Sequence, residues 1–273
     1  MNETMLDAVP SATPTSATPT PATPATVTAA VMVIGDEILS GRTKDKNIGW
    51  IAEYLTTMGI DLREVRVVPD IEEEIVAALN ALRARYTYVF TTGGIGPTHD
   101  DITADAVAKA FGVPLDLDER AVALLAERMG RENLNAARLR MARIPRGAAL
   151  VENPVSKAPG FWIGNVIVMA GIPAVMQGML EGVAPKLATG VKLLSDTVRA
   201  DLKEGDIGTE LGQLAKAHPD VMFGSYPFND ENGVPNANLV IRSRDPEKLA
   251  AAKVALVKML AEVRAGLAGA AGQ

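Results

Sequence analysis

Residues 91–103 decide the fold of this chain, and they read Thr-Thr-Gly-Gly-Ile-Gly-Pro-Thr-His-Asp-Asp-Ile-Thr. The apolar residues 86–90 before this stretch predict a buried strand, and the apolar spacing in residues 104–111 after it predicts a helix. Three glycines between strand and helix remove the Cβ atoms where backbone N–H groups would face a ligand. Because a helix N-terminus favours negative charge, the stretch predicts a phosphate-binding turn.

The same turn carries two adjacent carboxylates, Asp100 and Asp101. They would repel a bare phosphate, so a phosphate bound here needs a cation between them or a water that they activate. A structural explanation stays open, because Gly-Gly-x-Gly can form a tight turn and Asp100, Asp101 or Thr103 can cap the next helix. The glycines, Pro97 and the acid pair together favour a ligand site, since capping needs only one acid.

The composition is that of a globular protein, with 273 residues of which 48% are hydrophobic and 22% are charged. A chain of this length can bury a substantial core and can form two small domains. The 27 basic residues against 33 acidic ones, without a basic cluster, argue against nucleic acid as a partner. The absence of cysteine excludes disulfides and thiolate chemistry. The two histidines, His99 and His218, are far apart in sequence, so we interpret His99 as a neighbour of the acids and not as a metal ligand.

Residues 1–26 form a Pro/Thr/Ala-rich segment of low complexity. Such a segment buries too little apolar area to offset its ordering entropy, so we predict a disordered tail. It carries Glu3 and Asp7 instead of a basic start and has no continuous apolar core, which argues against a signal peptide. No later stretch is long and apolar enough to span a bilayer, so we expect a cytoplasmic protein without a membrane partner.

Strands and helices alternate from residue 27 onward, as in a layered α/β domain. The first predicted elements are strand 27–34, helix 48–58, strand 62–68, helix 71–82 and strand 86–91. A helix capped by Asp118, a helical segment 135–141, extended segments 148–152 and 161–169, and helix 174–187 complete a domain that we place at residues 27–189. The loop at residues 170–173 also follows a strand. We expect it near the first glycine loop, because parallel strands bring their carboxyl ends to one sheet edge.

The pattern changes after residue 189, and we place a second domain at residues 190–273. The predicted elements are strand 196–202, helix 207–217, strand 221–228, strand 238–243 and helix 246–263. This β-α-β-β-α order predicts a small ferredoxin-like α+β domain. Residues 224–227, Gly-Ser-Tyr-Pro, are interpreted as a tight bend inside a hairpin, with a ligand contact as the alternative.

Several motifs in the same order resemble one known family. They are residues 34–41 (Ile-Gly-Asp-Glu-Ile-Leu-Ser-Gly), Asp45-x-Asn47, residues 92–103, residues 158–161 (Ala-Pro-Gly-Phe) and residues 171–173 (Gly-Ile-Pro). Together they resemble the N-terminal region of the competence/damage-inducible protein CinA, which belongs to the molybdopterin-binding MoaB/MogA-like superfamily. The resemblance covers residues 27–187 and extends through the Gly-Ser-Tyr-Pro stretch into the second domain.

The resemblance implies a three-layer α/β fold, a homo-oligomer, and a pocket at the glycine loop that binds a small nucleotide or pterin. Members of the superfamily bind molybdopterin, and the CinA-like branch is associated with metal-dependent hydrolysis of pyrophosphates such as ADP-ribose, with relatives linked to FAD. CinA proteins also carry a nicotinamide mononucleotide deamidase domain. Nothing after residue 189 resembles that domain, so we do not expect deamidase activity. Two positions depart from the family pattern. Val175 stands where a glutamate is usual, and the usual Gly-x-Ala-Pro-Gly reads Ser156-Lys157-Ala158-Pro159-Gly160.

We expect the catalytic residues to be Asp100 and Asp101, with Asp101 and Asp36 binding a divalent cation, Mg²⁺, Mn²⁺ or Co²⁺. Asp36 and Glu37 either complete the cation site, bind ribose hydroxyls or cap the following turn. Lys157 either partners a phosphate or is solvated in a turn. The full set of predicted ligand-binding residues is Gly35, Asp36, Glu37, Ser40, Asn47, Thr92, Gly93, Gly94, Gly96, Pro97, Thr98, Lys157, Pro159, Gly160, Gly171 and Pro173.

These residues lead to a first hypothesis, a metal-dependent hydrolase of nucleotide pyrophosphates. Backbone N–H groups of Gly93, Gly94 and Gly96 would hold the phosphates. The alternative is a molybdopterin or nucleotide binding protein with the same pocket and no turnover. Val175 favours the alternative, whereas the intact acid pair favours the enzyme. A scaffold that uses the tail for partner contacts is the third and weakest hypothesis.

Overall fold

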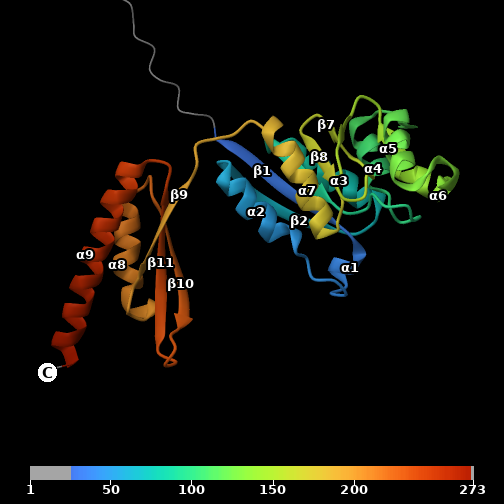
Figure 1. Cartoon of the computed structure of the whole chain (residues 1–273). Helices are drawn as coiled ribbons and strands as arrows, with labels where there is room; N and C mark the ends of the chain where they lie inside the picture. The colour runs from blue at the N-terminus through green and yellow to red at the C-terminus, as the bar shows by residue number, and fades with distance from the viewer. Residues whose placement is uncertain (1–25, 272–273) are drawn as a thin grey trace, which may run out of the picture.

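A computed structural model of the chain describes residues 26–271. The predicted disordered tail therefore lies outside the described residues, except for its last position. The first part of the chain contains a six-stranded mixed sheet with strand order β2-β1-β3-β8-β7-β6 (Figure 1). Its strands are β1 (Val27–Ile34), β2 (Ile60–Val68), β3 (Tyr88–Thr92), β6 (Ala149–Val151), β7 (Gly160–Ile163) and β8 (Val166–Met169). Strands β2, β1, β3 and β8 are mutually parallel. Strand β7 runs antiparallel to β8, and β6 runs antiparallel to β7.

Helices cover both faces of this sheet. They are α1 (Asp36–Leu39), α2 (Asn47–Thr57), α3 (Glu72–Arg83), α4 (Thr103–Phe111), α5 (Glu119–Met129), α6 (Ala136–Leu139) and α7 (Pro173–Val183), with short 3-10 turns η1 (Arg131–Asn133), η2 (Arg140–Ala142) and η3 (Ala184–Lys186). A small ribbon of β4 (Leu115–Leu117) and β5 (Arg143–Pro145) lies beside α4.

Alternation along β1 explains the three layers. Ala30, Met32 and Ile34 pack into a core with α3, α4 and α5. Ala29, Val31 and Val33 pack into a second core with α2 and α7. Successive side chains of a strand point to opposite faces, so a strand with helices on both faces must be apolar at nearly every position. The predicted three-layer α/β fold is confirmed.

The extended segment predicted at residues 161–169 is wrong in one respect, because it is a hairpin of two strands. Strands β7 and β8 pair in antiparallel fashion and turn at Gly164, whose φ is 55°. The indole N–H of Trp162 donates to the Gly164 carbonyl oxygen at 2.8 Å. The continuous apolar run hid the turn, because both strands are buried and only Gly164 and Asn165 interrupt the run.

The second part of the chain contains a three-stranded antiparallel sheet with strand order β10-β11-β9 and two helices. Its elements are β9 (Leu194–Arg199), α8 (Glu204–Ala217), β10 (Met222–Asn229), β11 (Pro235–Ser243) and α9 (Pro246–Ala271). Strand β11 lies between β9 and β10, which is the split β-α-β arrangement of a ferredoxin-like fold. Both helices pack against the sheet around a separate core that includes Ile207, Leu239 and Leu256. The predicted α+β class is confirmed.

The bend predicted at residues 224–227 is wrong. Gly224, Ser225, Tyr226 and Pro227 lie inside β10 in continuous register with β11. The hairpin turns later, where the Asp230 carboxylate accepts the backbone N–H groups of Asn232 and Val234, each at 2.9 Å. An aspartate whose carboxylate accepts backbone N–H groups two and four residues later stabilises a turn. The chain therefore reverses at this turn, and β10 needs no bend.

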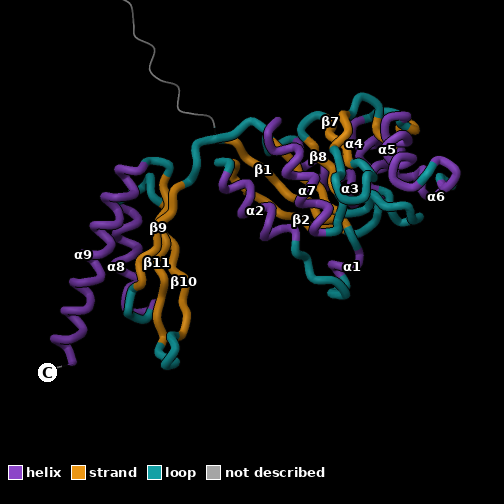
Figure 2. Tube along the Cα trace, in the orientation of Figure 1, coloured by secondary structure: helices purple, strands orange, loops and turns teal. Residues whose placement is uncertain are grey.

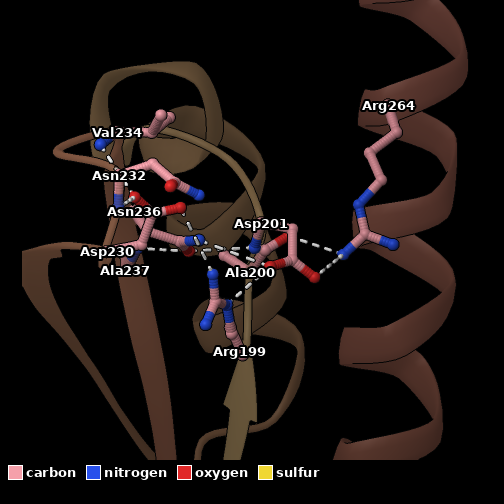
Figure 3. Close-up of polar contacts among 9 residues, drawn as sticks. All are labelled: Arg199, Ala200, Asp201, Asp230, Asn232, Val234, Asn236, Ala237 and Arg264. Atoms are coloured by element: carbon pink, nitrogen blue, oxygen red, sulfur yellow. Dashed lines mark hydrogen bonds and ion pairs between the residues drawn. The ribbon is translucent and has the colours of Figure 1, made fainter.

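Polar contacts join the end of β9 to the neighbouring turn and to α9 (Figure 3). The Asn236 side chain accepts the Asp201 backbone N–H at 3.0 Å. Arg199 donates to the Asp201 carboxylate at 2.6 Å, and Arg264 of α9 donates to the Ala200 carbonyl oxygen at 2.6 Å. These contacts hold the C-terminal half of α9 against the sheet.

A loop after η3 leads from the first part of the chain into β9 (Figure 2). Two glycines pack there without room for a side chain, since a Cβ on Gly59 would lie 2.3 Å from the Gly190 carbonyl oxygen. Asp61 of β2 also accepts the Arg244 guanidinium at 2.5 Å. No helix within residues 26–271 is long and apolar enough to cross a membrane.

Candidate functional site

A cleft opens where the parallel strands β1, β3 and β8 end. Its larger lobe has a volume of about 530 Å³ and its smaller lobe about 240 Å³. The larger lobe includes Gly94, Gly96, Pro97, Asp101 and Val175, and the smaller one includes Lys44, Asp45, Asn47 and Thr92. Five residues line both lobes: Glu37, Thr43, Gly93, Gly171 and Pro173. Ligands of open α/β sheets bind at this edge of the sheet.

The glycine loop after β3 is held by close backbone packing. Gly93 and Gly94 have φ angles of 104° and 65°. A Cβ on Gly93 would lie 2.1 Å from the Ile34 carbonyl oxygen, so only glycine fits. The buried Thr103 hydroxyl donates to the Gly93 carbonyl oxygen at 2.9 Å, and its backbone N–H donates to Gly94 at 3.1 Å. Thr103 therefore fixes the loop to the first turn of α4.

The backbone N–H groups of the three loop glycines differ in whether they already donate a hydrogen bond within the protein. The Gly93 N–H donates to the Met169 carbonyl oxygen at 3.2 Å, so it is not available to a phosphate. Within residues 26–271, no acceptor is found for the N–H groups of Gly94 and Gly96. The phosphate cradle expected from three glycines is therefore limited to these two.

Asp101 closes the loop instead of capping α4. Its Oδ2 accepts the Thr98 backbone N–H at 2.8 Å and the Thr98 hydroxyl at 2.5 Å. Helix α4 begins after Ile102 without a side-chain cap. In the described part of the chain, no donor is found for Asp101 Oδ1. That oxygen can bind a water or a cation beside the larger lobe.

Arg140 is a site residue that the sequence analysis missed. Its guanidinium donates to the carbonyl oxygens of Thr98 at 3.1 Å and Asp101 at 3.2 Å. The arginine comes from η2, about forty residues further along the chain, so no local pattern connects it with the loop. It brings a positive charge to the back of the acid pair and positions the loop.

Asp100 points to solvent and its side chain is 62% exposed. Its pKa lies below the usual value, because the Thr98 side chain and the Asp100 backbone are nearby and the charges of His99 and Arg140 are favourable. The Thr98 hydroxyl itself donates to Asp101, so the charges are the part of this effect that the contacts support. His99 is fully exposed, and its Nδ1 lies 3.9 Å from Asp100 Oδ1. Asp100 therefore stays ionised in solvent beside the glycine loop, and it lines neither lobe of the cleft.

Asp70 is a second residue that the sequence analysis missed. It follows β2 and accepts the Asp36 backbone N–H at 3.0 Å. Burial raises its pKa, and the charges of Asp36, Glu37 and Asp100 raise it further. The sequence did contain a signal for Asp70. It lies just after β2, which is parallel to β1, and the ends of parallel strands meet at one edge of a sheet.

The second glycine loop lies beside the first, as predicted. The Asn47 amide nitrogen donates to the Gly171 carbonyl oxygen at 2.8 Å. A Cβ on Gly171 would lie 3.3 Å from the Gly93 Cα. Asp45 Oδ1 accepts the N–H groups of Asn47 and Ile48, which fixes the start of α2.

Some predicted ligand residues lie elsewhere. Lys157 does not line either lobe, because its ammonium pairs with Glu127 of α5 at 3.4 Å. Gly160 is explained by packing, since a Cβ there would lie 2.1 Å from the Val168 carbonyl oxygen. Pro159 borders only a small hollow behind the loop. Gly35 and Ser40 flank α1 and do not line the lobes.

The carboxylates beside the cleft could bind a cation only together with a phosphate of the ligand. Within residues 26–271, no three His, Cys, Asp or Glu side chains are gathered as a metal cage. Mg²⁺ is commonly bound by one or two carboxylates together with substrate phosphates and waters. The free Oδ1 of Asp101 fits a cation that a bound phosphate helps to hold. Asp36 begins α1 and lines neither lobe, so its part in the cation site stays a prediction.

Fold and cleft together define a protein of the MoaB/MogA-like class. Residues 30–189 match the family described as "probable molybdopterin binding domain", and residues 192–265 match the one described as "FAD synthase, middle domain". The first match covers more than half of the chain. The chain therefore belongs to the molybdopterin-binding-domain family.

Relatives of similar length occur in archaea. A protein of Pyrobaculum calidifontis is 31% identical over 88% of this chain and 97% of its own length. Protein Ta0487 of Thermoplasma acidophilum is 31% identical over 78% of this chain and 85% of its own length. The crystal structure of the protein CinA from Thermoplasma acidophilum, described as of unknown function, is 37% identical. It matches with a TM-score of 0.56 over 58% of this chain and 96% of that chain.

Proposed function

We propose that this protein hydrolyses nucleotide pyrophosphates of the ADP-ribose or FAD kind with the help of a divalent cation. The observation that carries the proposal is the position of Asp101. Its Oδ2 is fixed by Thr98, while its Oδ1 is free beside the open N–H groups of Gly94 and Gly96. One carboxylate oxygen thus lies ready next to an anion-binding turn.

The glycine loop supplies the binding of the phosphates. Backbone N–H groups of a turn that have no protein acceptor can bind phosphate oxygens without side-chain entropy, and here these are the N–H groups of Gly94 and Gly96. Arg140 lies behind the loop and offsets the repulsion between the acids and the phosphates. The larger lobe also has apolar walls, including Ile95, Met141 and Val175, that can hold a nucleobase or a flavin ring.

The acids supply the chemistry. Asp101 and Asp36 would hold the cation, which neutralises phosphate charge and lowers the pKa of a bound water. Asp101, with Asp100, orients the attacking water toward one phosphorus. The water oxygen would bond to that phosphorus while the bond from the phosphorus to the bridging oxygen breaks. The protons of the water would pass to the departing phosphate and to solvent, and two monophosphates would leave.

A direct assay tests this proposal. The purified protein is incubated with ADP-ribose and FAD, with and without Mg²⁺, Mn²⁺ or Co²⁺, and the products are separated by chromatography. We expect metal-dependent cleavage to two monophosphates. Binding of these compounds without products under every metal condition would contradict hydrolysis.

The second candidate is a binding protein for molybdopterin or a nucleotide that does not turn its ligand over. Two observations favour this second candidate. The matching family is described as a probable molybdopterin binding domain, and Val175 in the cleft is 6% exposed and offers no group to a cation. Either candidate takes a small-molecule ligand and, as we propose from the family, acts as a homo-oligomer. Mass photometry measures the number of subunits.

A further inference from the structure

Two residues that line the smaller lobe of the cleft carry a buried side-chain oxygen without a partner. Asn47 and Thr92 are 4% and 1% exposed, and both line this lobe. Within the described residues, Asn47 Oδ1 and Thr92 Oγ1 form no hydrogen bond. Buried polar atoms in folded proteins are normally paired, so two such atoms beside one cavity indicate a ligand.

The orientation of the Asn47 amide is fixed by its neighbour. Its nitrogen donates to the Gly171 carbonyl oxygen, and a flipped amide would place two oxygens together. The free Oδ1 can therefore only accept a hydrogen bond. A phosphate or carboxylate oxygen cannot satisfy it, because those groups only accept at neutral pH.

A hydroxyl group satisfies both atoms. It can donate to Asn47 Oδ1, and it can either donate to or accept from the Thr92 hydroxyl. The smaller lobe meets the larger, apolar one at Gly93 and Gly171, next to the phosphate-binding turn. A ligand with phosphates at the turn and a flat ring in the larger lobe would extend its other end into the smaller lobe.

We propose that Asn47 and Thr92 form a subsite for a sugar hydroxyl at the end of the ligand beyond the phosphates. This inference rests on the proposed function and makes it more specific. The preferred ligand then has two unlike halves, a planar ring and a sugar, joined by the pyrophosphate. ADP-ribose has both halves, whereas ADP lacks the terminal sugar.

The test compares Thr92→Val with Thr91→Val. Valine matches threonine in shape and removes only the hydroxyl. Thr91 is a matched control, because it is 0% exposed, its Oγ1 is also without a partner, and it lines neither lobe. Both changes remove a buried unpaired hydroxyl, so neither should lower the melting temperature.

Binding of ADP-ribose and ADP is measured by calorimetry in EDTA and again with Ca²⁺, which also takes carboxylate and phosphate oxygens as ligands. Chromatography of the recovered ligands checks that no turnover occurred. We expect Thr92→Val to weaken the binding of ADP-ribose by about tenfold, which corresponds to the loss of one hydrogen bond. The binding of ADP should not change. Thr91→Val should change neither. Equal loss for both ligands, or no difference between the two variants, would overturn the subsite while leaving the hydrolase proposal standing. If the unaltered protein binds neither compound in EDTA nor in the presence of the cation, both proposals fail.

Discussion

The Thr103 hydroxyl donates to the Gly93 carbonyl oxygen at 2.9 Å and joins the first turn of α4 to the glycine loop. Thr103 is fully buried, so its hydroxyl has no alternative partner in solvent. Thr103→Val should cost about 1–2 kcal/mol in unfolding free energy, because it leaves a buried carbonyl without its donor. Thr103→Ser keeps the hydroxyl and should lose less. Urea denaturation measures both, and a Thr103→Val variant that is as stable as the unaltered protein would contradict a role for this hydrogen bond.

Gly93 cannot accept a side chain. Its φ is 104°, and a Cβ would lie 2.1 Å from the backbone oxygen of Ile34. Gly93→Ala should therefore cost about 3 kcal/mol or more, since backbone atoms cannot move aside cheaply. The matched control is Gly182→Ala in α7, where a Cβ meets nothing within 4 Å. That change should be neutral or stabilising by up to about 1 kcal/mol, because alanine favours a helix. Similar melting temperatures for the two variants would contradict the close packing.

Asp101→Asn separates the charge of this side chain from its role in closing the loop. Asparagine keeps an oxygen that can accept the Thr98 N–H and hydroxyl, so the fold should survive. Loss of the charge should lower the hydrolysis rate by about 100-fold or more. Chromatography of the products measures the rate, and circular dichroism follows the fold. Asp116→Asn is the control, because Asp116 pairs with Arg146 outside the cleft. Unchanged turnover of Asp101→Asn with metal present would remove Asp101 from the mechanism.

Asp70 should make stability depend on pH. Burial and the charges of Asp36 and Glu37 raise its pKa in the folded protein above the usual 3.8. The folded protein then holds this proton more tightly than the unfolded chain, so this residue lowers stability as the pH rises from 3.8 through its raised pKa. Asp70→Asn keeps an acceptor for the Asp36 N–H and removes the charge. We expect it to raise the melting temperature at pH 7 and to match the unaltered protein below pH 3.8. A variant that is less stable at pH 7 would contradict this account.

The sequence by itself determined the layers of this protein and the place of its cleft. Apolar residues at nearly every position of β1 require helices on both faces of the sheet, and glycines directly after a strand allow a backbone approach that no other residue permits. The order of elements in the second part predicted its antiparallel sheet in the same way. The division into domains at residues 27–189 and 190–273 stays a prediction.

Only the tertiary structure decided which side chains meet at the cleft. Arg140 and Asp70 reach the acids from η2 and from the end of β2, and Lys157 pairs with Glu127 away from the cleft. Local patterns report the periodicity of one element, whereas these contacts depend on how distant elements pack. The same reason explains Asn47 and Thr92, whose unpaired oxygens become visible only when α2, β3 and the loop before α7 come together around one cavity.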